Sequence, residues 1–137
     1  MTVNTVNLFI SHSWKYADHY DGLTALLEKA PYFKYKNYSV PKDDPIHNVG
    51  TDRELTEAIH NQMLPTSAVL ILAGVYASYS KWINIEIRLA RMMLKPIIAV
   101  VPWGAEKIST PVKQAADMIV HWNTDSVVNA IREVCRA

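Results

Sequence analysis

The sequence predicts a three-layer α/β domain, in which a five-stranded parallel sheet is covered by helices on both faces. Two observations lead to this prediction. Short apolar runs alternate with stretches of helical periodicity along the 137 residues, as in successive β-α units. Two of the runs, residues 68–73 and 97–101, are continuously apolar, which is expected of strands buried on both faces of a parallel sheet.

The first half of the chain predicts the order strand, helix, strand, helix. Pro31 ends the first helical stretch, because proline cannot continue a helix. Thr51 and Glu54 have the spacing of a capping box and mark the start of the second helix. The expected elements are a strand over 7–10, a helix from about 23 to 30, a strand over 35–40, a loop over 41–50 and a helix over 51–64.

The second half continues the alternation. Thr124 or Asp125 can cap a last helix that contains Val128, Ile131 and Val134. The expected elements are a strand over 68–73, a helix over 80–95, a strand over 97–101, a strand over 118–120 and the last helix from about 124 to 134. Repeats and interdomain linkers are absent from the sequence, so a single domain over 1–137 is expected.

Composition argues against several classes of function. The net charge of +1 gives no electrostatic reason to expect a nucleic-acid partner. The longest apolar stretches, 67–75 and 96–102, are shorter than the ~20 residues that span a bilayer. The first residues do not resemble a secretory signal, and Cys135, the one cysteine, cannot form an internal disulfide. A cytoplasmic protein without membrane contacts is therefore expected.

Ligands of open parallel sheets bind beyond the carboxyl ends of the strands. The four tryptophans lie in the segments that follow the strands or at the start of the helix after 68–73. Large aromatic side chains beside polar groups suit a flat heterocyclic ligand. For Trp103 and Trp122, closure of the ends of the core is an equally good interpretation. The segments that follow the strands are 11–14, 41–44, 74–76, 102–104 and 121–122.

Glu86 is the sharpest single candidate. It belongs to a largely apolar stripe of the predicted helix, with Trp82 one turn before it and Leu89 and Ala90 one turn after. A carboxylate among apolar groups is expected to have a perturbed pKa and is a candidate functional group. Two structural alternatives remain open at this point: a glutamate turned toward solvent, or an ion pair with a basic residue from elsewhere. The stripe consists of Tyr79, Trp82, Ile83, Glu86, Leu89, Ala90 and Met93.

Other motifs predict little chemistry. The five histidines lack metal-ligand spacing, and one cysteine cannot complete a zinc site, so no metal is expected. Asp18 and Asp21 suit the start of the first helix, whereas Asp43, in a loop at the binding edge, could reach a ligand. The glycine patterns of a hydrolase elbow, a dinucleotide fold or a phosphate-binding loop are absent from the sequence.

Two motifs together resemble Toll/interleukin-1 receptor (TIR)-like domains, especially the bacterial ThsB group of Thoeris antiphage defence. The first is Leu-Phe-Ile-Ser-His-Ser-Trp at 8–14, followed by Asp18. The second is Ser-Lys-Trp-Ile-Asn-Ile-Glu-Ile at 80–87, where a tryptophan precedes a glutamate by one turn. Residues 41–50 take the place of the family's BB loop, although their sequence departs from that of many TIR domains. The resemblance implies a flavodoxin-like sheet of order 2-1-3-4-5.

The resemblance also implies an activity, namely cleavage of the nicotinamide–ribose bond of NAD⁺ as a substrate, with linear or cyclic ADP-ribose-type products. Glu86 would be the catalytic carboxylate, and no other cofactor is expected. Self-association and a separate effector protein that senses the product are the expected partners. The residues expected to bind substrate are Phe9, Ser11, His12, Trp14, Asp43, Tyr79 and Trp82.

Two other functions compete with this one. A catalytically silent TIR module would serve protein–protein assembly, although Glu86 and Trp82 argue against it. A nucleoside deoxyribosyltransferase-like enzyme also uses a glutamate on a flavodoxin-like sheet, and free nucleosides as substrates would distinguish it. A phosphoacceptor receiver domain is disfavoured because residues 70–74 contain no aspartate at the end of the strand.

Overall fold

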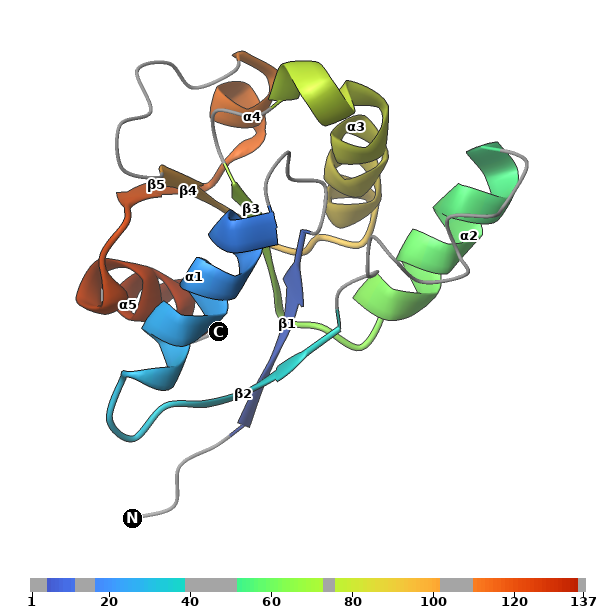
Figure 1. Cartoon of the computed structure of the whole chain (residues 1–137). Helices are drawn as coiled ribbons and strands as arrows, with labels where there is room; N and C mark the ends of the chain where they lie inside the picture. The colour runs from blue at the N-terminus through green and yellow to red at the C-terminus, as the bar shows by residue number, and fades with distance from the viewer. Residues whose placement is uncertain (1–4, 12–16, 39–51, 73–75, 102–109, 136–137) are drawn as a thin grey trace.

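The computed structural model describes residues 5–11, 17–38, 52–72, 76–101 and 110–135. Strands and helices alternate through the described part of the chain, as the sequence predicts (Figure 1). The strands are β1 (Thr5–Ile10), β2 (Lys34–Asn37), β3 (Ala68–Leu72), β4 (Ile97–Val101) and β5 (Met118–His121). The helices are α1 (Ala17–Glu28), α2 (Asp52–Met63), α3 (Tyr76–Met92), α4 (Thr110–Ala115) and α5 (Thr124–Val134).

The five strands form one parallel sheet in the order β2-β1-β3-β4-β5. The sheet therefore has the flavodoxin-like order 2-1-3-4-5 that the family resemblance implies. Phe9 of β1 lies opposite Val69 of β3, and Val69 lies opposite Ile97 of β4. This register aligns the buried residues of the three inner strands in rows across the sheet.

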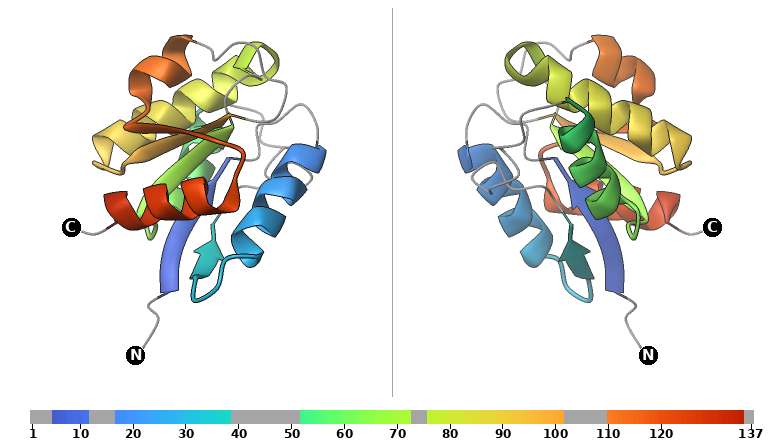
Figure 2. Two further views of the ribbon diagram at one scale, coloured as in Figure 1. Left: turned by 90° about the vertical axis from the view of Figure 1, so that its left-hand side faces the viewer. Right: turned by 90° about the vertical axis from the view of Figure 1, so that its right-hand side faces the viewer.

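Helices cover both faces of the sheet. Helices α1 and α5 lie on one face, and α2, α3 and α4 lie on the other (Figures 1 and 2). Because side chains alternate along a strand, each inner strand contributes to both faces. Leu8 and Ile10 pack with α1 and α5, whereas Phe9 between them packs with α2 and α3. The same alternation determines on which face of the sheet Ser11, the residue after β1, is expected to lie.

The inner strands are buried as the sequence predicts. Residues 68–71 of β3 are inaccessible to solvent, and every residue of β4 is buried. The edge strands differ, because only one side of each is paired. In β2, Lys34 and Lys36 are exposed, and in β5, Ile119 is 41% exposed. The two continuously apolar runs thus correctly identify β3 and β4 as buried strands, whereas β1, the third inner strand, is fully buried over residues 8–10 alone.

Helix α3 begins and ends earlier than the sequence predicts. It runs from Tyr76 to Met92 rather than over 80–95. The amide of Lys95 donates to the carbonyl of Ala90 (2.8 Å), and the amide of Leu94 donates to that of Arg91 (3.2 Å). This is the Schellman pattern that ends a helix, with Leu94 at the left-handed position, φ 57°. Backbone hydrogen bonding, rather than Pro96 alone, therefore ends α3.

The remaining differences are local. Helix α4 is not predicted from the sequence, because its six residues contain only two buried apolar positions, Val112 and Ala115. Strand β2 covers 34–37 rather than 35–40, and residues 39 and 40 lie outside the described residues, as do Thr51 and the loop at 41–50. The predicted cap of α5 is wrong. Asn123 caps this helix through its side chain, which accepts from the amide of Ser126.

Candidate functional site

Ser11 immediately follows β1 and continues its hydrogen-bond ladder. Its amide donates to the carbonyl of Leu70 in β3 at 2.9 Å. Two residues before it, Phe9 packs in the core beneath α2 and α3. Because residues two apart in a strand share a face, Ser11 is expected on this same face. Its side chain is completely buried at the carboxyl end of β1.

Glu86 lies within α3 and is also completely buried. The neighbours one turn before and after it, Ile83, Leu89 and Ala90, are buried apolar residues. The structure therefore excludes the alternative in which this glutamate turns toward solvent. Few glutamates are fully buried in proteins, because desolvation of a carboxylate is unfavourable.

The two buried polar residues meet inside the apolar core. The hydroxyl of Ser11 donates to Oε1 of Glu86 at 2.8 Å, and Oε2 of the same carboxylate is itself buried. A hydrogen bond to an ionised group contributes roughly 1.5–3 kcal/mol. Burial of an ion costs several kcal/mol. The Ser11 hydroxyl offsets part of the free energy of burying this carboxylate. Buried polar pairs of this kind are common where a residue serves function rather than stability.

The structure brings three of the predicted site residues to one place, namely Phe9, Ser11 and Glu86. Tyr79 and Trp82 belong to α3 by their backbone, but their side chains lie outside what the structure describes. His12, Trp14 and Asp43 lie outside the described residues altogether.

The sequence names Ser11 and Glu86 separately and misses their direct contact. A signal for it exists in the strand period. Ser11 shares its face with Phe9, and α3 covers that face. The strand period thus gives the face on which Ser11 lies, but the face that α3 covers is known only from the structure.

The packing of Trp122 favours a structural role for this residue over a role in stacking against a ligand. The ring is half-buried and packs against the core between the sheet and helices α1 and α5. A Cβ added to Gly22 of α1 would lie 2.9 Å from Cζ2 of this ring. Trp122 therefore closes the end of the core against α1. His121 before it is exposed, and Trp103 lies outside the described residues.

In the described part of the chain, no group of three or more histidine, cysteine, aspartate or glutamate side chains is arranged to hold a metal ion. Among the helices that the structure describes, none has both the length and the apolar character to cross a bilayer.

The parallel order 2-1-3-4-5, with helices on both faces, defines a flavodoxin-like α/β domain of the TIR-like type. Residues 9–107 match the family model described as Thoeris protein ThsB, TIR-like domain. The match covers well over half of the chain and includes both Ser11 and Glu86, so the chain belongs to this family. Comparison with curated proteins gives no match. Family membership supports a role in the Thoeris defence system, which implies partner proteins.

Proposed function

We propose that this domain cleaves the bond between nicotinamide and ribose in NAD⁺, with Glu86 as the catalytic carboxylate. The observation that carries the proposal is a fully buried glutamate, held by the Ser11 hydroxyl at 2.8 Å, at the carboxyl end of β1. Ligands of this class of sheet bind at that end of the strands. TIR-like domains often cleave NAD⁺, which agrees with the family of this chain.

The chemistry requires few groups. Nicotinamide is cationic while attached to ribose and leaves as a neutral molecule, so no general acid is needed. The ribose passes through an oxocarbenium-like state, and a nearby carboxylate stabilises its developing positive charge. In this proposal, a ribose hydroxyl takes the place of the Ser11 hydroxyl at Glu86. Ser11 is then a positioning residue that holds the carboxylate before substrate arrives.

Capture of the ribosyl cation decides the product. Attack by water releases a proton and gives ADP-ribose, whereas attack by a group of the same molecule gives a cyclic product. Exclusion of water favours the second outcome. We propose a soluble signal of this kind, sensed by a separate effector protein, with self-association of the enzyme and a cytoplasmic location.

The test is to incubate the concentrated wild-type chain with NAD⁺ and to follow nicotinamide and nucleotide products by mass spectrometry. Glu86→Gln is the test variant, and Glu133→Gln, at an exposed position of α5, is the matched control. Release of nicotinamide by wild type and Glu133→Gln, but not by Glu86→Gln, is expected. Equal inertness of all three in concentrated solution would favour the assembly module. Cleavage of free nucleosides but not of NAD⁺ would favour the deoxyribosyltransferase-like enzyme.

A further inference from the structure

Two exposed apolar side chains occupy unfavourable backbone positions. Tyr32 and Leu94 are the non-glycine residues with positive φ in the described part of the chain, at 58° and 57°. They are also its most exposed large apolar side chains, at 83% and 90%. The left-handed conformation costs an L-residue roughly 1–2 kcal/mol, which glycine avoids. The fold therefore gains nothing evident from a leucine at position 94.

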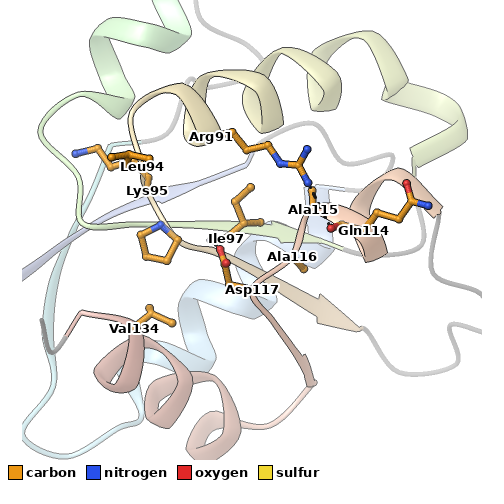
Figure 3. A pocket seen from close by; sticks show the side chains of 10 residues that line it. Arg91, Leu94, Lys95, Ile97, Gln114, Ala115, Ala116, Asp117 and Val134 are labelled. Carbon is orange, nitrogen blue, oxygen red and sulfur yellow. Dashed lines mark hydrogen bonds between the residues drawn. The ribbon is translucent and has the colours of Figure 1, made fainter.

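Leu94 borders a cavity at the amino ends of the strands, the end of the sheet opposite Ser11. The cavity has a volume of about 500 Å³ and is open to solvent. It lies between the end of α3, the end of α4, the starts of β4 and β5, and α5 (Figure 3). Its walls include Arg91, Leu94, Lys95, Gln114, Asp117 and Val134.

The cavity has more positive than negative charge at its walls. Arg91 donates to the carbonyl of Gln114 at 3.4 Å, and Lys95 donates to the carbonyl of Leu64 at 3.1 Å. Both acceptors are neutral, so these bonds orient the cations without neutralising them. Among the described residues of the lining, Asp117 is the acidic one, and its Oδ2 accepts from the amide of Ile97 at 2.8 Å. The excess of cationic over anionic side chains therefore favours an anionic ligand.

The surface beside this cavity is both apolar and basic. Met92 at the end of α3 is 72% exposed, and Leu64, whose carbonyl binds Lys95, is 55% exposed. Among the α3 side chains that the structure describes, the exposed ones are Asn84, Arg88, Arg91 and Met92, with no acidic residue. Exposed apolar side chains that adjoin cations are typical of protein-binding surfaces.

Nucleic acid fits this surface poorly. Among the described residues of the lining, Arg91 and Lys95 are the cations, and two cations are too few to neutralise a continuous phosphate backbone. None of these described residues is aromatic, so a base has no ring on which to stack. A protein segment can instead place single carboxylates beside Arg91 and Lys95 and avoid Asp117.

We propose that this cavity is the docking site of an acidic segment of a partner protein. A large apolar side chain of the segment fills the cavity against Leu94, and flanking carboxylates contact Arg91 and Lys95. The site is independent of the proposed NAD⁺ chemistry, because it lies at the other end of the sheet. In this proposal Leu94 is the apolar contact for this segment, which accounts for a leucine in an unfavourable backbone conformation.

The test uses random 12-residue peptides displayed on phage, selected on the immobilised wild-type chain after removal of those that bind Leu94→Gly. The expected result is a consensus of one large apolar residue flanked by aspartate or glutamate. A synthetic peptide of that consensus, measured by fluorescence anisotropy, should bind Leu94→Gly at least ~10-fold more weakly, because glycine removes the apolar surface that the peptide covers. Arg91→Gln should also weaken binding, and added salt should weaken it further.

Tyr32→Gly is the matched control, because it also replaces an exposed apolar residue at positive φ. It should leave peptide binding unchanged. Both glycine variants relieve backbone strain and should keep or raise the melting temperature, so weaker binding by Leu94→Gly cannot be attributed to unfolding.

Several outcomes would overturn the proposal. One is a selection that yields no peptide dependent on Leu94, or a consensus that is basic or uncharged. Another is binding of fluorescein-labelled single-stranded RNA that Leu94→Gly abolishes, which would make the surface a nucleic-acid site. A third is dimerisation in analytical ultracentrifugation that Leu94→Gly abolishes, which would make a second copy of the chain the occupant.

Discussion

The hydroxyl of Ser11 and the carboxylate of Glu86 form a buried polar pair, 2.8 Å apart and fully enclosed at the carboxyl end of β1. The two residues are 75 positions apart in the sequence, and they join the sheet to the middle of α3. The neighbours of Glu86 one turn away on α3, Ile83, Leu89 and Ala90, are buried and apolar. A polar pair in such surroundings is energetically sensitive, because loss of one partner leaves the other buried without it.

Replacement of Glu86 by glutamine should separate activity from stability. Glutamine has nearly the same shape and can still accept from Ser11 through its amide oxygen, but it cannot carry a negative charge. We expect nicotinamide release to fall ~100-fold or more. The free energy of unfolding should stay the same or rise by about 1 kcal/mol. Urea denaturation and the mass-spectrometric assay measure the two effects. A large loss of stability would instead indicate a structural role for the carboxylate.

Replacement of Ser11 by alanine should destabilise the domain. The variant removes the hydroxyl that donates to Oε1 of Glu86 and leaves the carboxylate buried without this donor. We expect a loss of about 1–3 kcal/mol in the free energy of unfolding, measured by urea denaturation. Ser67→Ala is the matched control, because Ser67 is exposed and the change there should have little effect.

A double-mutant cycle tests whether this effect acts through Glu86. If it does, Ser11→Ala in a Glu86→Gln background should be less destabilising by about 1 kcal/mol, since a neutral amide is easier to bury than a charge. Strictly additive effects of the two substitutions would show that the residues do not interact energetically.

The sequence predicts the sheet well because burial dominates the inner strands. The apolar run at 97–101 matches β4 residue by residue, and the run at 68–73 contains β3. Features that depend on short-range polar contacts are harder to predict. Asn123 caps α5 because its neighbour Thr124 instead donates to the carbonyl of Leu26 in α1. That choice depends on tertiary contacts, and capping propensity alone cannot distinguish Asn123 from Thr124.

The sequence names the residues of the candidate site but does not predict the contact between them. The apolar stripe of α3 predicts Glu86, and the resemblance to TIR-like domains implies Ser11. Their contact depends on which face α3 covers, which the order of elements does not determine by itself. The cavity beside Leu94 was not predicted at all. Its leucine occupies a position where glycine usually ends a helix, so the sequence gives no stop signal there.

Cys135 should react slowly with alkylating reagents in the folded chain. Burial raises the pKa of its thiol above the ordinary value, so less of the reactive thiolate is present near neutral pH. We expect iodoacetamide to modify the folded chain more slowly than the urea-unfolded chain at pH 8. The pH at which the rate is half-maximal should also be higher for the folded chain. Identical pH profiles of the two forms would contradict this expectation.

The same pKa shift links the thiol to stability. Since the folded state holds the proton of Cys135 more tightly, its contribution is fully present below the thiol's ordinary pKa. That contribution is lost as pH rises through the higher pKa of the folded state. We expect the free energy of unfolding of wild type to decline more steeply in this alkaline range than that of Cys135→Ala. Parallel curves for the two proteins would argue against the linkage.

The contact between Gly22 and Trp122 should reverse the usual effect of a glycine-to-alanine substitution in a helix. Alanine within a helix is normally more favourable than glycine by roughly 0.8–1 kcal/mol. In α1, however, the added Cβ would lie 2.9 Å from Cζ2 of Trp122, and the rigid ring must move from its place against the core. We expect Gly22→Ala to lower the free energy of unfolding by about 1 kcal/mol, within the range for overpacked cores.

The control for this prediction removes the ring. In a Trp122→Ala background, the clash is absent, so Gly22→Ala should regain its favourable helix propensity and stabilise the domain relative to that background. The change of sign between the two backgrounds, measured by urea denaturation, identifies the ring as the cause. If Gly22→Ala stabilises the wild-type chain, Trp122 moves without cost, and its role in closing this end of the core is weaker than the packing against α1 indicates.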